Sequence, residues 1–149
     1  MTFLYFAYGS NMLTKRLVAS NRCPSAKPIG IAIAANHKLV FEKRSIDKSG
    51  KATLSPVEGV HTPGVLFEIC NSDLTNLRRA EGSGYDRHDQ FAVKCAKMSE
   101  EEVLVKTYLA KNPKDGFKPY DWYLALVIAG ALQHELGCDH VKMLRQTEY

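Results

Sequence analysis

The sequence predicts an α+β fold, in the form of a small mixed β-barrel or a strongly curved sheet with flanking helices. Segments with the pattern of strands outnumber segments with the pattern of helices, and the two kinds do not alternate regularly along the chain. Such an order favours a mixed sheet with helices packed outside it. The 149 residues contain no internal repeat and no long linker, so we expect a single domain over residues 1–149.

Most of the predicted elements are strands. Residues 3–8 are aromatic-rich and form a short run, which is typical of a buried strand. Residues 29–42 are long enough for one strand or a pair, with an irregularity expected near Asn36. Short apolar or alternating runs predict further strands over 52–55, 64–69, 91–95 and 103–109.

Three helices are predicted from their periodicity and from residues suited to begin or end them, and a short fourth one closes the chain. Asparagine and serine are favoured where a helix begins, and glycine is favoured just past its end. The signals and helices are Asn11 for 12–18, Ser72 for 73–80 and Gly137 for 120–136.

The composition excludes several classes of protein. No apolar run approaches the roughly 18 residues needed to span a bilayer, so we expect no membrane partner. The formal charge of +4 comes from basic residues spread along the chain, with no dense basic cluster of the kind that binds nucleic acid. The start, MTFLYFAYG, lacks a basic segment and a cleavage signal, so we expect a cytoplasmic protein.

The four cysteines are far apart in the sequence and include no C-x-x-C pair. They are therefore expected to be free thiols. The stretch HELGCDH holds His134 and Cys138, which would share a face of a continuous helix, but Gly137 is expected to end the helix between them. We therefore expect a helix end here and no metal site.

The turn after the first strand, YGSN, is a candidate binding site. Gly9 allows the backbone to approach a ligand without an intervening side chain. Backbone N–H groups of such a turn, and of the helix start that follows, favour a negative charge. The alternative is a plain connection from strand to helix with Asn11 as the cap. The spacing fits neither a phosphate-binding loop nor a G-x-S-x-G elbow.

The second candidate stretch is LRRAEGSGYDRHD, residues 77–89. Glu81 lies where a helix ends in a glycine-rich loop, and the negative end of the helix dipole raises the pKa of a carboxyl group there. Such a carboxylate is a better general base near neutral pH. The alternative is an exposed glutamate in the last turn. Tyr85 and Arg87 could line the same pocket or lie at a sheet edge.

Together the stretches YFAYGSNM, EGSGYDR and PYDWYLALVIAGA resemble the γ-glutamylcyclotransferases in order, spacing and chain length, over most of residues 3–137. The resemblance implies a small mixed β-barrel in which the α-amine of a γ-glutamyl amide attacks its own γ-carbonyl and releases 5-oxoproline. It implies Glu81 as the catalytic base and acid, with no metal or other cofactor. The implied substrate-binding residues are Tyr5, Phe6, Ala7, Tyr8, Gly9, Ser10, Asn11, Tyr85 and Tyr120.

The same resemblance implies a small-molecule γ-glutamyl substrate, a role in glutathione metabolism, and a homodimer as the family-level expectation. The loop GSGY after Glu81 is shorter than in the animal enzymes. Glutathione, γ-glutamyl dipeptides, γ-glutamyl-ε-lysine and γ-glutamylated amines share the reacting end, so the leaving-group side of the pocket would decide between them. Candidate contributors on that side are Arg78, Arg79, Arg87 and His88.

Three other functions stay open at this point. The first is a binding module for γ-glutamyl compounds that has no catalytic activity. The second is an amidohydrolase with Ser10 as nucleophile and His88 or Asp86 as its partners, which would release glutamate. The third is an interaction domain that presents Tyr120, Trp122 and Tyr123 to a partner.

Overall fold

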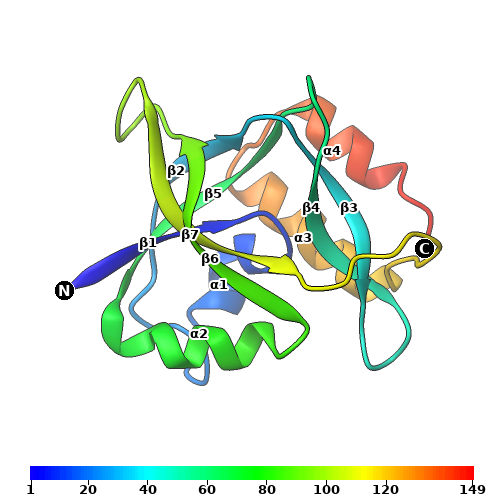
Figure 1. Cartoon of the computed structure of the whole chain (residues 1–149), viewed down its shortest axis with the longest axis horizontal. Helices are drawn as coiled ribbons and strands as arrows, with labels where there is room; N and C mark the ends of the chain where they lie inside the picture. The colour runs from blue at the N-terminus through cyan, green and yellow to red at the C-terminus, as the bar shows by residue number, and fades with distance from the viewer.

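The computed structural model describes all 149 residues and contains a closed, five-stranded barrel (Figure 1). The strands lie in the order β1 (Thr2–Ala7), β5 (Thr62–Cys70), β2 (Lys27–Ala34), β6 (Tyr85–Lys94) and β7 (Glu102–Ala110). All neighbours are antiparallel except β1 and β7, which pair in parallel at Tyr5 and Lys106 and so close the barrel. The predicted mixed barrel is confirmed.

Strands β3 (His37–Arg44) and β4 (Gly50–Pro56) form a separate hairpin beside the barrel (Figure 1). Asn36 has a positive φ of 57° between β2 and β3, which a short polar side chain tolerates better than a bulky one. The irregularity predicted near Asn36 is therefore the turn that takes the chain out of the barrel into the hairpin.

The helices are short, and in the view of Figure 1 α2 lies below the barrel strands while α3 and α4 lie on the side of the β3–β4 hairpin. They are α1 (Thr14–Leu17), α2 (Leu74–Glu81), α3 (Asp121–Gln133) and α4 (Cys138–Arg145), with 3₁₀ turns at Ser10–Met12 and Asn71–Asp73. No helix is both long enough and apolar enough to cross a membrane.

The predicted helix signals were wrong in three places. Neither Asn11 nor Ser72 caps a helix with its side chain, and α2 begins at Leu74 after a 3₁₀ turn. Gly137, with a φ of 100°, precedes α4, whereas α3 already ends at Gln133. The Asn11 side chain is instead drawn into a long-range contact, which is described below.

The core fixes the end of β1 from two sides. The ring of Phe6 is fully buried and stacks on that of Phe91 with centroids 6.2 Å apart. On the other side α3 packs closely on the turn that follows β1, because a Cβ on Gly130 would lie 2.7 Å from the Met12 Cβ and from the Leu13 nitrogen. The turn after β1 is therefore held on well-packed elements.

Candidate active site

The turn after β1, the end of α2 and the first turn of α3 meet around a small cavity of about 40 Å³. Strands β4, β6 and β7 complete its walls. The lining residues are Tyr5, Tyr8, Gly9, Ser10, Asn11, Ala52, Glu81, Tyr85, Tyr108 and Tyr123. Glu81 is the only carboxylate among them, and no histidine or cysteine contributes.

The carboxylate of Glu81 is held in the cavity by two side chains from the N-terminal part of the chain. The Tyr5 hydroxyl donates a hydrogen bond of 2.8 Å to Oε1, and the Asn11 Nδ2 donates one of 3.0 Å to the same oxygen. Asn11 Nδ2 also lies 3.2 Å from the Tyr5 hydroxyl. The other oxygen, Oε2, receives no hydrogen bond from the chain and is available to a ligand.

Burial raises the pKa of the Glu81 carboxyl above its ordinary value. The hydrogen bonds from Tyr5 and Asn11 lower that pKa, as do the nearby charges of Arg22 and Arg16, but burial outweighs them. The raised pKa predicted from the sequence is confirmed in direction. Its main cause is burial, whereas the sequence argument relied on the helix dipole.

The turn itself has unused hydrogen-bond donors. The N–H groups of Met12 and Leu13 bond to the carbonyls of Gly9 and Ser10, but the N–H groups of Ser10 and Asn11 have no acceptor in the chain.

The side chains of Ser10 and Asn11 are each bonded to an arginine. Arg16 Nε donates to Ser10 Oγ at 3.2 Å, and Arg22 donates to Asn11 Oδ1 at 3.0 Å. The turn therefore combines free N–H groups with a local positive charge, which favours an anion.

The tyrosine hydroxyls around the cavity are mostly fixed by the backbone. Tyr85 donates to the Ala52 carbonyl at 2.6 Å, and Tyr8 donates to the Tyr108 carbonyl. The Tyr123 hydroxyl accepts from the Ala52 N–H at 3.1 Å, and burial raises its pKa to about 12. These bonds join β4 of the hairpin to the barrel and to α3, and they hold the walls in place.

The structure brings together seven of the ten residues that the sequence analysis placed in the site. Phe6 and Ala7 lie in the core of the barrel and do not line the cavity. Tyr120 also lies outside the lining, since its hydroxyl donates to the Asp47 carbonyl at 2.8 Å and the residue is exposed. The seven that line the cavity are Tyr5, Tyr8, Gly9, Ser10, Asn11, Glu81 and Tyr85.

Three lining residues were not predicted. Ala52 and Tyr108 come from strands β4 and β7, whose patterns carry no local mark of a site. Tyr123 lies one helical turn beyond Tyr120 in the stretch PYDWY. Because α3 begins at Asp121, Tyr123 is the buried member of that pair, with only 6% of its surface exposed.

The geometry bears on the alternative sites as well. The Ser10 hydroxyl is bonded to Arg16, and an arginine side chain cannot accept a proton from it. His88 lies on the exposed part of β6, outside the cavity. His134 contacts the Thr14 hydroxyl at 3.0 Å, and no group of three or more His, Cys, Asp or Glu side chains is placed to hold a metal. Tyr123 is buried and so is not part of an exposed aromatic face.

A partly buried carboxylate with a free oxygen, placed beside an anion-favouring turn at the end of a small barrel, defines a site suited to acid–base catalysis. The model of the AIG2-like family matches residues 46–144, about two-thirds of the chain. This chain therefore belongs to the AIG2-like family.

Its relatives include enzymes of one activity. Human γ-glutamylcyclotransferase is 30% identical over 152 residues, covering 99% of this chain and 79% of that protein. The bovine γ-glutamylcyclotransferase is 29% identical over the same coverage. A solved structure of a γ-glutamyl cyclotransferase superposes with a TM-score of 0.88 at 29% identity, covering 99% of this chain and 89% of that one.

Proposed function

We propose that this chain is a γ-glutamylcyclotransferase in which Glu81 acts as the general base and then as the general acid. It converts a γ-glutamyl amide into 5-oxoproline and a free amine or amino acid. The observation that carries the assignment of Glu81 is its position: a desolvated carboxylate with one unbonded oxygen, held by Tyr5 and Asn11 against the turn after β1.

The reaction requires few catalytic groups from the protein because the substrate carries its own nucleophile. The α-amine closes a five-membered ring on the γ-carbonyl, and effective molarities for such closures reach about 10⁵ M or more. The amine is mostly protonated at neutral pH, so a base must remove its proton. Glu81 takes that proton and returns it to the departing amine, which contributes roughly 10² to 10⁴ in rate.

The turn after β1 supplies hydrogen-bond donors that favour a negatively charged group of the substrate. The N–H groups of Ser10 and Asn11 are free, and the side chains of the same two residues accept hydrogen bonds from Arg16 and Arg22. The free N–H groups would hold either the α-carboxylate of the substrate or the oxygen of the attacked carbonyl as charge develops on it. The lining residues Tyr8, Gly9 and Tyr85 would enclose the γ-glutamyl group.

The reaction class is tested by identifying the product. The purified protein is incubated with glutathione, γ-glutamyl dipeptides, γ-glutamyl-ε-lysine and γ-glutamylated amines, and the products are analysed by mass spectrometry. We expect 5-oxoproline from at least one of them, in equal amount with the free amine. Free glutamate would indicate hydrolysis and overturn the proposal, and binding without any product from the panel would favour the non-catalytic alternative.

Tyr5→Phe is expected to move the acidic limb of the kcat/KM profile to higher pH. The Tyr5 hydroxyl donates to Glu81 Oε1 and lowers the pKa of that carboxyl. Without this bond the pKa rises further, so a higher pH is needed to ionise the base. The measurement is kcat/KM between about pH 4 and pH 9. Tyr149→Phe, at an exposed tyrosine near the chain end, is the control and should leave the limb in place. An unmoved or lowered limb in Tyr5→Phe would contradict the role of Glu81.

A further inference from the structure

A larger groove opens beside the catalytic cavity. It has a volume of about 690 Å³ and shares two wall residues, Tyr85 and Tyr108, with the cavity. A groove that continues from the cavity past these two tyrosines is positioned to receive the part of a γ-glutamyl substrate beyond the scissile amide.

The groove is strongly basic. Arg78 and Arg79 enter it from the last turn of α2, Arg87 from β6, and Lys111 from the residue after β7. Asp86 is the only carboxylate in its lining. The same short helix that ends in Glu81 therefore places two arginines just outside the catalytic cavity.

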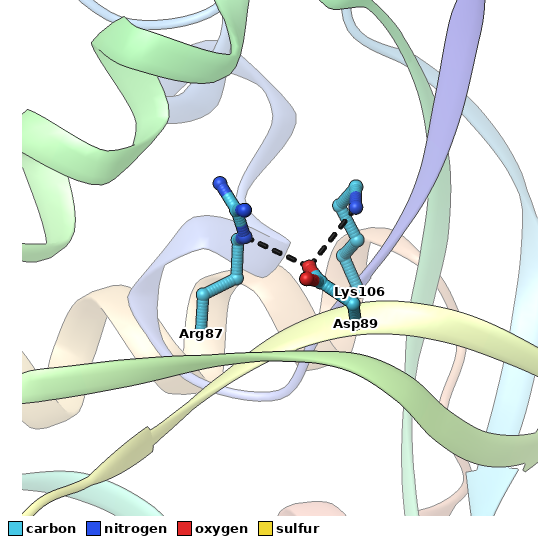
Figure 2. Close-up of polar contacts among 3 residues, drawn as sticks. All are labelled: Arg87, Asp89 and Lys106. Carbon is cyan, nitrogen blue, oxygen red and sulfur yellow. Dashed lines mark hydrogen bonds and ion pairs between the residues drawn. The ribbon is translucent and has the colours of Figure 1, made fainter.

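Most of this positive charge is not neutralised within the chain. Arg78 and Arg79 form no ion pair, and the pair between Lys111 and Asp86 is long, at 3.9 Å. The ion pair of Arg87 runs from its Nε, which donates to Asp89 Oδ1 at 2.8 Å, while Lys106 approaches the same oxygen at 2.9 Å. Figure 2 shows the two terminal nitrogens of Arg87 turned away from that carboxylate. A planar guanidinium held in this way can still bind a ligand carboxylate.

The junction between cavity and groove contains an unused polar group. Tyr108 is only 3% exposed, and its hydroxyl has no hydrogen-bond partner in the chain. Burying a hydroxyl without a partner is unfavourable. Because Tyr108 lines both spaces, a ligand that passes from one to the other would give the hydroxyl a partner.

We propose that this groove is the leaving-group subsite and that it selects γ-glutamyl compounds whose departing amine carries two or more carboxylates, as in γ-glutamyl-linked acidic amino acids. The inference rests on the proposed cyclotransferase function. A leaving amino acid with a neutral side chain offers one carboxylate to four cations, whereas an acidic side chain offers a second. His88, which the sequence analysis grouped with these arginines, does not line the groove.

The test compares γ-glutamylglutamate with γ-glutamylglutamine, two substrates of nearly the same shape that differ by one charge. We expect kcat/KM to be about tenfold higher for γ-glutamylglutamate at low ionic strength, which corresponds to about 1.4 kcal/mol. The preference should shrink as salt is added, because the groove is open to solvent. A ratio near one, or a ratio that salt does not change, would overturn the proposal.

Variants of the lining residues test whether the preference for γ-glutamylglutamate arises in the groove. In the double variant Arg78→Gln/Arg79→Gln the ratio is expected to fall towards one, and Lys111→Gln, at the lining residue that follows β7, should also lower it. Arg145→Gln is the matched control, because Arg145 is an exposed arginine in the last turn of α4, well away from the lining of the groove. An unchanged ratio in the groove variants would overturn the proposal.

The outcome separates this proposal from the proposed function. If both dipeptides release 5-oxoproline with equal kcat/KM, the cyclotransferase function holds and the selective subsite is wrong. If neither this pair nor any other γ-glutamyl compound releases 5-oxoproline, the proposed function itself fails.

Discussion

Replacing Glu81 by glutamine is expected to lower kcat/KM by about 10²- to 10⁴-fold while the fold is kept. The amide oxygen of glutamine can still accept the hydrogen bonds that Tyr5 and Asn11 donate to Oε1. The amide cannot take a proton from the substrate amine, so binding is retained and turnover is lost. The measurement is steady-state formation of 5-oxoproline, together with substrate binding by titration calorimetry.

Glu81→Gln is expected to lower turnover but to increase stability relative to the native protein as the pH rises. Since burial raises the folded-state pKa of Glu81, the folded protein holds a proton there more tightly than the unfolded chain does. Stability therefore falls as the pH rises from the unfolded pKa through the raised folded pKa. Glu81→Gln removes this loss, so its Tm relative to the native protein should increase as the pH rises through that window.

The control for this prediction is Glu100→Gln, at an exposed glutamate between β6 and β7. It should change neither turnover nor the pH dependence of Tm. Turnover in Glu81→Gln within a factor of about ten of the native value would rule out the assigned role, because general acid–base catalysis contributes more than that.

The second large effect is expected at Gly64, in β5. A Cβ at this position would collide with the Ala7 carbonyl oxygen and would lie 2.7 Å from two carbons of the Phe6 ring. Neither neighbour can move away, since Phe6 is fully buried and Ala7 belongs to the strand paired with β5. We expect Gly64→Ala to lower the free energy of unfolding by about 3 kcal/mol, at the upper end of the usual cost of overpacking.

Gly64→Ala should also weaken substrate binding, because the displaced strand leads directly into the turn that lines the cavity. Gly30→Ala is the matched control, a barrel-strand glycine whose added Cβ would meet only the flexible side chain of Lys97, at 2.9 Å. Its cost should stay near the 0.5 kcal/mol typical of surface changes. Urea unfolding of both variants measures the difference, and equal costs would contradict the packing argument.

The sequence predicted those parts of the candidate site that lie in the stretches resembling the γ-glutamylcyclotransferases. Glu81 lies before a glycine-rich loop, and Gly9 and Ser10 follow an aromatic strand. The residues next to them in the chain therefore indicated a candidate site. The mixed barrel followed from the number and order of the strands. These features depend on residues within one or two elements of each other.

The parts that could not be predicted depend on contacts between distant segments. The family resemblance placed Asn11 in the site, but its local pattern indicated only a helix cap, and its bond to Glu81 forms only in the folded chain. Ala52 enters the cavity because the β3–β4 hairpin folds back onto the barrel. The choice between Tyr120 and Tyr123 depends on where α3 begins, and helix boundaries are the least certain element of any sequence pattern.

The hydrogen bonds to Glu81 join residues that are 76 and 70 positions apart in the chain. Closing so long a loop is entropically costly, and no local segment can hold Tyr5, Asn11 and Glu81 together by itself. The proposed catalytic arrangement is therefore a property of the whole closed barrel. During refolding, activity should return in step with the slowest tertiary event and not with the recovery of helix or strand signal, which makes the enzymatic assay a reporter of barrel closure.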